Sequence, residues 1–354
     1  MIVEELPSIA ALEAARLATS CGAYCGVARL RSLEVDTRWR THYIAVRLER
    51  ALVGVLPTYA LLVDAWPDPA YNLPAAVGSS DSAASGREWL LVGGRTDHAA
   101  GFLRAEDAPA EFVARAAREA GRAAEALART DGRRLAAAYV NPVEREYLAA
   151  AFAADASERV VTREALLPVV GDGVGDYLAS LRSSQRSVVR RDWRERERLR
   201  LATRLLPWLE VMQYAPALVA DVAVGHGAPE HPLLVRMRLE SWLANPEITT
   251  FAFEVTAGSD VLAVSLAWRW RDLLQLYEVG LAPIGTPGRH VAYVEALIYA
   301  PLRHAAAIGC SELRLGMDSS HPKRVRGASL RDVAILLEEP RPARVSRAAT
   351  RCTT

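Results

Sequence analysis

The chain has 354 residues, of which 51% are hydrophobic and 24% are charged, so it is long enough for two domains and too apolar for wholesale disorder. Its four cysteines, scattered between positions 21 and 352, exclude the framework of a disulfide-stabilised secreted domain. The sequence shows no basic, apolar leader after Met1 and no apolar run long enough to cross a membrane. We therefore expect a cytoplasmic protein without a membrane span.

The first part of the chain predicts a helical start followed by a sheet. Residues 5–30 are rich in Ala, Leu and Glu, which predicts an amphipathic helix or a pair of helices. Apolar runs separated by glycine, proline and charged turns then predict short strands. The predicted strands are 42–48, 52–59, 89–92 and 135–140, and the predicted helices are 109–129 and 143–154.

The second part of the chain predicts a similar series. The predicted helices are 176–199, with Asp176 as its N-cap, and 208–224, 233–243 and 291–307. The predicted strands are 164–170, 251–255, 261–268, 273–280, 312–315 and 333–337. The last residues, 338–354, are rich in Pro, Arg and Ala and predict a disordered tail.

A hairpin, a strand, a glycine turn, a long helix and a strand follow one another at 42–140 and again at 251–316. This repeat predicts an α/β (α+β) protein of two tandem domains, each with a mixed central sheet flanked by helices. We place the domains at residues 1–160 and 161–337, before the tail. A tandem duplicate places a cleft between its copies, where ligands commonly bind.

One residue is singled out by composition alone. Of the 43 Lys and Arg residues, Lys323 is the only lysine. In a chain that otherwise uses arginine, a lysine indicates a position that needs a compact, rotatable ammonium rather than a planar guanidinium. The alternative is a chance survivor on a solvated loop.

Arginines at positions 182, 186, 190 and 194 fall at helical i, i+4 spacing and predict a basic stripe on the helix 176–199. A stripe of this kind is typical of a surface that binds a polyanion such as RNA or a nucleotide diphosphate. We assign an anion site to Arg186, Arg190 and Arg191, since no acidic residue precedes them in the helix after Asp176. From Arg194 onward, a solvated face with Arg–Glu pairs explains the pattern better.

The strand 273–280, the glycine- and proline-rich loop 283–288 and the helix that follows form a unit whose free backbone N–H groups can bind a phosphate. A plain connecting loop is the alternative. At the end of that strand, Tyr277 is a candidate for orienting a substrate, although a half-buried strand tyrosine explains it as well. Glu278 or Asp318 is a candidate for taking a proton from an attacking amine. No metal site is predicted.

Several motifs resemble one known family. The segment 177–191 and the segment 293–305, followed by Gly309, Leu315-Gly316 and Lys323-x-x-Arg326-Gly327, are similar to the second domain of tandem GNAT proteins. The resemblance extends to the Fem-like aminoacyltransferases and to actinobacterial GNAT N-acyltransferases described as peptidoglycan biosynthesis proteins. It implies two GNAT-like domains, of which the second holds the acyl-transfer site.

The resemblance also implies roles for residues. Lys323 is expected near the transferred carbonyl or the terminal phosphates of the donor, with Arg326 as a supporting anion clamp. The catalytic candidates are Lys323, Tyr277 and Asp318. The candidates for binding substrate or phosphate are Arg326, Arg186, Arg190, Arg191, Glu278 and Tyr299.

The expected function is that of an aminoacyltransferase. It would take an aminoacyl group from aminoacyl-tRNA, without a bound cofactor, and join it to an amine of a small molecule or peptide in natural-product or cell-wall precursor synthesis. An acyl-CoA donor is the first alternative, although Gly285-Thr-Pro-Gly288-Arg-His does not fit the acyl-CoA signature of ordinary GNAT enzymes. A non-catalytic binding protein on the same fold is the second.

Overall fold

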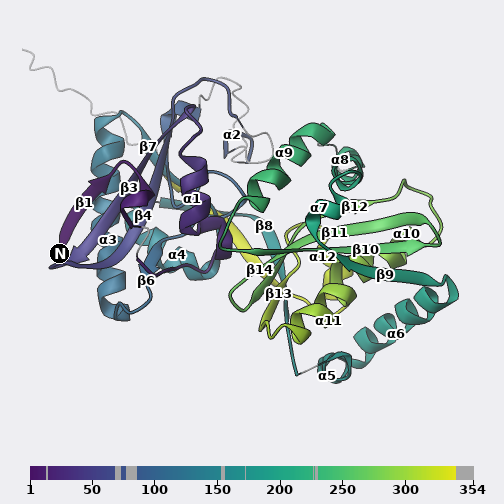
Figure 1. Cartoon of the computed structure of the whole chain (residues 1–354). Helices are drawn as coiled ribbons and strands as arrows, with labels where there is room; N and C mark the ends of the chain where they lie inside the picture. Colours follow the sequence, from purple (N-terminus) through teal and green to yellow (C-terminus); the bar gives the residue numbers. More distant parts are fainter. Residues whose placement is uncertain are drawn as a thin grey trace, which may run out of the picture.

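A computed structural model of the protein describes residues 1–12, 15–67, 73–76, 86–152, 156–171, 173–225, 227 and 230–339. Within these residues, fourteen strands form one sheet with helices on both of its faces (Figure 1). The mixed α/β class predicted from the sequence is confirmed. The predicted tail lies outside the described residues from position 340 onward.

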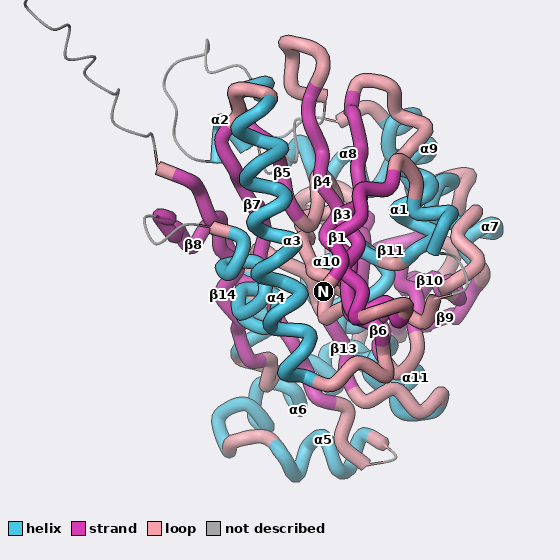
Figure 2. Tube along the Cα trace, turned by 90° about the vertical axis from the view of Figure 1, so that its left-hand side faces the viewer, coloured by secondary structure: helices cyan, strands magenta, loops and turns pink. Residues whose placement is uncertain are grey.

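One half of the sheet comes from the N-terminal part of the chain, with one addition from the C-terminus. Its strands, from the edge inward, are β1 (Ile2–Leu6), β3 (Trp39–Leu48), β4 (Ala51–Leu61), β5 (Trp89–Val92), β7 (Arg134–Val140) and β14 (Ser329–Glu338). Neighbours are antiparallel except β5 and β7, which are parallel and joined through helix α3 (Ala110–Thr130). Figure 2 shows α3 lying across this half. The short strands β2 (Leu17–Ala18) and β6 (Leu103–Ala105) pair beside β4.

The other half has the same strand order. Its strands, from the edge inward, are β9 (Leu201–Leu206), β10 (Thr249–Ala257), β11 (Asp260–Trp270), β12 (Leu273–Leu281), β13 (Glu312–Arg314) and β8 (Ala156–Pro168). Here β12 and β13 are the parallel pair. The chain between them forms α10 (Arg289–Val294), the π-helical turn η5 (Glu295–Tyr299) and α11 (Ala300–Ala307). The strand order therefore confirms the predicted repeat.

Helices bury an apolar face on each side of the sheet. In the N-terminal half, α3 and α4 (Pro142–Leu148) enclose an alanine-rich core on one face, and α1 (Val27–Leu33) packs on the other. In the C-terminal half, one face is covered by α5 (Val174–Ser180), α6 (Ser183–Arg198) and α10 to α11. The opposite face is covered by α7 (Trp208–Val211), α8 (Ala215–Gly225) and α9 (Pro232–Leu243).

The two halves exchange their innermost strands. Strand β8 follows the N-terminal half in the sequence but pairs with β13, and β14 follows the C-terminal half but pairs with β7. The two exchanged strands also pair with each other, from Ser329 opposite Leu166 to Glu338 opposite Ala156. The predicted boundary between residues 160 and 161 falls inside β8, where the register with β14 shifts by one residue between the pairs Thr162–Val333 and Val160–Ala334. That boundary stays a prediction.

The predicted helices at 5–30 are wrong for most of their length. Ile2–Leu6 is an edge strand antiparallel to β3, and the helix α1 begins only at Val27. Between them lie two short 3₁₀ turns, η1 (Ile9–Leu12) and η2 (Gly22–Cys25). Pairing with the edge of a preformed sheet overrides the helical propensity of Ala, Leu and Glu, which is a weak local preference.

The single helix predicted at 176–199 is in fact two helices, α5 and α6. Leu181 and Arg182 between them are extended, with ψ angles of 153° and 157°. The break turns Leu181 into the core, where it packs against Gly327 so closely that a side chain at that glycine would collide with it. The N-cap of α5 is Gly173, so the predicted capping role of Asp176 is also wrong.

A search of the described helices for a membrane crossing found none with the necessary length and apolar character.

The strand exchange predicts that β14 is needed by both halves. A chain ended after Gly327 loses Val333, Ile335 and Leu336, each at least 96% buried, and leaves β7 and β8 each without one of its two partner strands. At roughly 1.5–3 kcal/mol per buried apolar side chain, this loss is about as large as the stability of a typical domain. We expect the shortened chain to show no cooperative unfolding transition when a urea titration is monitored by circular dichroism.

The matched control is a chain ended after Glu339, which keeps every described residue. It should unfold like the full chain. A cooperative transition at an unchanged midpoint in the shorter chain would contradict the structural importance of the exchange.

Candidate functional site

The candidate site is built around an irregularity in strand β12. Between the pairs Leu266–Glu278 and Ala267–Leu276, β12 carries one residue more than β11, and that residue is Tyr277. An extra residue of this kind is a β-bulge, which interrupts the hydrogen-bonded ladder and redirects the neighbouring side chains.

The same strand is open along part of its other edge. It pairs with β13 only over residues 273–275, whereas β12 itself continues to Leu281. Within the described ranges, no further strand pairs with this edge, so the two strands part beside the bulge. Unpaired backbone N–H and C=O groups at such a point can bind an extended or carbonyl-bearing ligand.

The side chains of Tyr277 and Glu278 both contact helix α9 and its surroundings. The ring centroid of Tyr277 lies 5.6 Å from that of Trp242 on α9 and 5.1 Å from that of Trp268 on β11. Glu278 accepts a 2.8 Å hydrogen bond from Arg238 of α9. The bulge thus places an aromatic ring and a carboxylate next to each other on one face of the sheet.

Residues of the N-terminal half reach the same place. The ring of Tyr24, in η2, lies 5.6 Å from that of Trp242 and 6.4 Å from that of Tyr277. Arg29 of α1 donates a 2.8 Å hydrogen bond from Nε to Asp97, and its guanidinium lies 4.6 Å from the centre of the Trp242 ring. We call this set the junction cluster: Tyr24, Arg29, Asp97, Arg238, Trp242, Tyr277 and Glu278.

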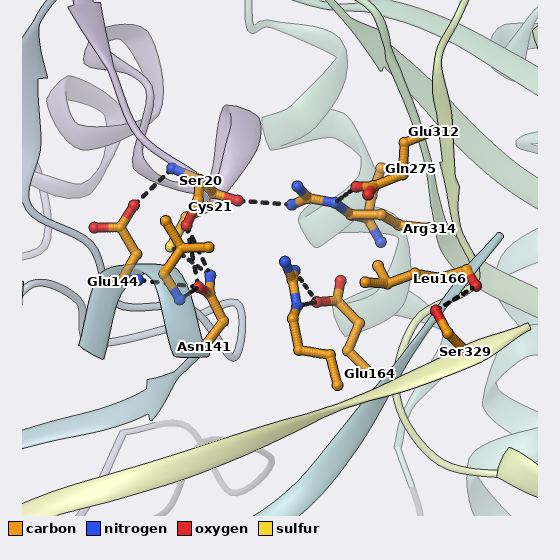
Figure 3. A network of polar contacts seen from close by, with 12 residues as sticks. Ser20, Cys21, Asn141, Glu144, Glu164, Leu166, Gln275, Glu312, Arg314 and Ser329 are labelled. Carbon is orange, nitrogen blue, oxygen red and sulfur yellow. Dashed lines mark hydrogen bonds and ion pairs between the residues drawn. The ribbon is translucent and has the colours of Figure 1, made fainter. Parts of the chain in front are cut away.

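Figure 3 shows how both halves hold the segment that precedes Tyr24. The backbone N–H of Ser20 donates to the buried carboxylate of Glu144 at 2.6 Å, and Asn141 donates to the Ser20 hydroxyl at 3.0 Å. From the other half, Arg314 donates to the Ser20 carbonyl at 2.8 Å. These contacts fix the chain four residues before Tyr24 and so position its ring.

Burial and mutual repulsion shift the titration of the junction cluster. Burial raises the pKa of Glu278 above its usual range, against the opposing effect of the Arg238 guanidinium. Burial also raises the pKa of Tyr277, with Asp97 as the next contribution, and that of Tyr24, with Tyr277 and then Asp97 adding to it. Both tyrosines are therefore neutral hydrogen-bond donors at neutral pH, and Glu278 is a stronger base than an exposed glutamate.

The loop that carries Asp97 has a strained backbone. Asp97 and the next residue, His98, have φ angles of 60° and 50°, and Tyr139, whose ring lies 4.5 Å from that of His98, has a φ of 60°. Non-glycine residues in the left-handed region cost roughly 1 kcal/mol or more each, and they gather where a side chain must be presented in one particular way. Sequence reasoning did not single out Tyr24, Asp97 or His98, because only the fold brings them to β12.

Lys323 lies in the short helix α12 (Ser320–Arg324) and is buried. Its ammonium donates to the backbone carbonyls of Gly316, Met317 and Asp318 at 3.1, 2.8 and 2.9 Å. Burial lowers the pKa of Lys323 to about 8, with Asp318 and Glu164 acting in the opposite direction. All three N–H donors are occupied, so the lysine holds the turn after β13. Its predicted contact with a transferred carbonyl stays a prediction.

Arg326 and Tyr299 meet at a buried carboxylate. Arg326 donates from Nε to Asp192 of α6 at 2.7 Å, and the Tyr299 hydroxyl donates to the same oxygen at 2.7 Å. The Tyr177 hydroxyl donates to the Arg326 carbonyl at 2.6 Å. This network fastens α6 and η5 to α12. The predicted binding of substrate or phosphate by Arg326 and Tyr299 stays a prediction.

Helix α6 separates two hollows. The larger, of about 900 Å³, is lined by Ser183, Arg186, Ser187, Arg190, Trp193, Arg194 and Glu197. The smaller, of about 440 Å³, lies between α6 and the loop after β12 and is lined by Arg191, Asp192, Glu195, Thr286, Gly288, Arg289, His290 and Val291. Arg186 and Arg190 thus face the first hollow and Arg191 the second. The lining of the first hollow is net positive, with three arginines and one glutamate, whereas the two arginines of the second are balanced by Asp192 and Glu195.

The predicted site residues therefore form three groups rather than one. Lys323, Asp318, Arg326 and Tyr299 surround α12; Tyr277 and Glu278 belong to the junction cluster; the α6 arginines line the hollows. Glu164 links the first two groups, since its charge acts on both Lys323 and Tyr24. Among the described residues, no three His, Cys, Asp or Glu side chains are arranged to hold a metal ion.

The sequence matches no protein family profile. No curated protein is similar to it in sequence. Among solved structures, the chain resembles FemX at 10% identity, over 94% of this chain and 96% of that one, with a TM-score of 0.59. It also resembles a conserved protein of unknown function from Bacteroides thetaiotaomicron at 9% identity, over 96% of this chain and 100% of that one, with a TM-score of 0.56.

A tandem GNAT protein from the clavulanic acid biosynthesis pathway overlaps less closely, at 13% identity and a TM-score of 0.48 over 96% of this chain and 100% of that one. Identities this low establish a shared fold and leave the reaction open. The likeness to FemX spans nearly the whole of both chains, and it confirms the predicted fold class.

The three hydrogen bonds that the Lys323 ammonium donates predict that arginine cannot replace this residue. A planar guanidinium cannot direct three N–H groups at three converging carbonyls in a closed site, and an unsatisfied buried polar group costs about 1–3 kcal/mol. We expect Lys323→Arg to lower the free energy of unfolding by about 2–4 kcal/mol in urea titrations. The exposed neighbour Arg324 supplies the control, since Arg324→Met should change little. Wild-type stability in Lys323→Arg would show that the turn does not depend on the ammonium.

Proposed function

We propose that this protein is an acyltransferase that transfers an aminoacyl group from aminoacyl-tRNA to the amine of a small molecule or peptide. The observation that carries the proposal is the position of β12, whose open, bulged segment runs from the smaller hollow, which contains Arg191 and Arg289, to the junction cluster. Leu281, at the end of β12, precedes the loop that lines the smaller hollow, and Tyr277 lies four residues earlier, about 13 Å along the strand. A donor with terminal phosphates in the hollow can place its ester at the bulge.

The reaction needs few protein groups, since an ester is already activated. The amine nitrogen attacks the ester carbonyl, the C–N bond forms, the C–O bond breaks, and the terminal hydroxyl of the tRNA leaves with a proton. Backbone N–H groups at the bulge would stabilise the oxyanion, and Glu278 would take the proton from the amine. The turn held by Lys323, after β13, borders the open edge of β12 and limits the space for the donor.

The likeness to FemX supports acyl transfer by fold analogy alone. The smaller hollow supports a donor with phosphates and suits a diphosphate, as in acyl-CoA, as well as the backbone of RNA. The larger hollow favours tRNA, because its arginines extend the positive surface along α6 well beyond the reach of one diphosphate.

The deciding experiment offers both donor classes to the purified protein. Total tRNA charged with labelled amino acids and a panel of acyl-CoA thioesters are each incubated with a mixture of amines, and loss of label from the donor is followed. We expect turnover of an aminoacyl-tRNA. Turnover of a thioester but not of aminoacyl-tRNA would support the acyl-CoA alternative. Turnover of neither donor would support a non-catalytic binding protein.

The larger hollow predicts a salt-dependent affinity for tRNA. Arg186→Gln, Arg190→Gln and Arg194→Gln together should weaken tRNA binding and reduce the slope of log K against log salt by about 2, at roughly 0.7–0.9 per phosphate contact. Filter binding between 50 and 200 mM salt would measure this.

The matched control removes the same charge from another exposed helix face, with Arg115→Gln, Arg118→Gln and Arg122→Gln on α3. It should bind tRNA like the wild type. Equal losses in both triple variants would mean that net charge, and not the α6 surface, binds the RNA.

The titration of Glu278 predicts the acidic limb of the pH–rate profile. A general base must be deprotonated, so activity is present above its pKa in the folded protein and is lost as the pH falls through it. Because burial raises this pKa, the limb should lie above the usual value of 4.5. Glu278→Gln should abolish the limb together with most of the activity, whereas Glu240→Gln, an exposed change on the neighbouring helix α9, should preserve both. An unchanged limb in Glu278→Gln would exclude this base.

A further inference from the structure

The junction cluster contains charged groups besides Glu278, the proposed general base. The cluster holds two carboxylates, those of Asp97 and Glu278, and two guanidiniums, those of Arg29 and Arg238. A third carboxylate, that of Glu230, lies beside the cluster and bonds Arg238. The local balance is therefore one negative charge, in a protein whose cationic surfaces lie along α6.

Both arginines are fully engaged. Arg29 bonds Asp97 through Nε and lies within hydrogen-bonding distance of Ser241 through Nη1. Arg238 bonds both Glu230 and Glu278. Neither guanidinium can bind an incoming anion without breaking an ion pair within its own half, Arg29 with Asp97 or Arg238 with Glu230 and Glu278.

The carboxylates, in contrast, are only half used. Asp97 accepts from Arg29 through Oδ2, and Glu278 accepts from Arg238 through Oε1. The second oxygens, Asp97 Oδ1 and Glu278 Oε2, make no hydrogen bond in the described part of the chain. The Glu278 side chain is 24% exposed and that of Asp97 is 4% exposed, so the Glu278 carboxylate is the more accessible of the two. One free acceptor comes from each half of the molecule.

Aromatic rings complete the surroundings of these oxygens. The rings of Tyr24 and Tyr277 are partly exposed and lie 6.4 Å apart, and the charges of Asp97 and Glu278 both act on both of them. Aromatic faces and carboxylate oxygens bind the same class of ligand, a compact cation with several N–H donors. An alkyl ammonium has this chemistry, whereas a carboxylate or phosphate would meet three acidic groups.

We propose that the acceptor of the reaction is a primary alkylammonium compound that binds across the junction, between Asp97 of the N-terminal half and Glu278 of the C-terminal half, against the rings of Tyr24 and Tyr277. This inference rests on the proposed function and deepens it, because it names the charge and class of the acceptor. It also assigns Asp97 as the residue that selects the acceptor.

The bound ammonium gives one proton to Glu278 and becomes a free amine, whose lone pair forms the new C–N bond. The ester C–O bond breaks, and the leaving alkoxide takes the second nitrogen proton. The products are the amide, the terminal hydroxyl of the donor and a protonated Glu278, which returns its proton to water.

The strained loop fits this assignment. Asp97 and His98 are consecutive left-handed residues, and Arg29 fixes the Asp97 carboxylate from α1 while it stacks on Trp242 of α9. The N-terminal half thus holds one carboxylate rigidly against a ring system that belongs mostly to the other half. A rigid acceptor group of this kind selects by charge at little entropic cost.

Binding is tested without any donor, by calorimetric titration and by tryptophan fluorescence, since Trp242 lies in the cluster and Trp268 beside it. The probe is n-butylammonium, with butyrate and butanol as the anionic and neutral analogues of similar size. We expect saturable binding of butylammonium alone. Asp97→Asn should weaken it about ten- to a hundredfold, the effect of one charge-assisted hydrogen bond. Asp107→Asn, an exposed change in the same half, should leave it unchanged.

A second variant guards against misfolding of the first. Tyr24→Leu removes an aromatic face and leaves the Arg29–Asp97 pair in place, and it should also weaken butylammonium binding severalfold. If both variants keep the wild-type melting temperature and the wild-type affinity, the inference is overturned. Equal binding of butyrate would overturn it as well.

Failure of this inference and failure of the proposed function give different results. If no donor is turned over but butylammonium binding depends on Asp97, the cation site is supported and the acyl-transfer function is contradicted. If an amine is acylated and Asp97→Asn raises neither the KM for that amine nor its Kd, acyl transfer stands and the assignment of Asp97 falls. We expect Asp97→Asn to raise the KM for the amine at least tenfold with a smaller change in kcat.

Discussion

Strands β8 and β14 lie side by side in the middle of the sheet, and each is paired with the half of the chain that it does not follow. This ladder of backbone hydrogen bonds fixes the two halves in one orientation. Because of it, the loop with Asp97 and the turn with Tyr24 always face the bulge in β12. An open hinge between two independent domains would not hold partly exposed rings 6.4 Å apart across the junction.

The two halves share a topology but use it differently. In the N-terminal half, the parallel pair β5 and β7 is crossed by α3, whose buried face is built of alanines and packs closely. In the C-terminal half, the equivalent pair parts beside Tyr277, and its crossover helix contains a π-helical turn. Pro301 explains that turn, since it has no N–H for the carbonyl four residues earlier. The two copies therefore differ at their parallel pair, and only the C-terminal copy has the bulge at Tyr277 beside it.

Much of the fold followed from sequence patterns. The hairpin strands, α3 and α9 were predicted within a few residues, because alternation and helical periodicity are local signals. The edge strand β1 and the break at Leu181 were not, since a distant partner decides each: β3 in one case and Gly327 in the other. The single lysine directed attention to a buried position where the ammonium donates to three backbone carbonyls, and its predicted role in the reaction stays a prediction. Asp97 and Tyr24 carry no local signal at all, since only the exchanged strands bring them to Glu278.

The central claim is that an amine and an aminoacyl ester meet at the bulge of β12. Mass spectrometry of the product tests it most directly, after the protein is incubated with charged total tRNA and an excess of a primary alkylamine. The account predicts an amine whose mass has increased by one amino-acid residue, formed by the wild type and lost in Glu278→Gln. An unmodified amine beside intact aminoacyl-tRNA, under conditions in which the protein is folded and binds both, would contradict it.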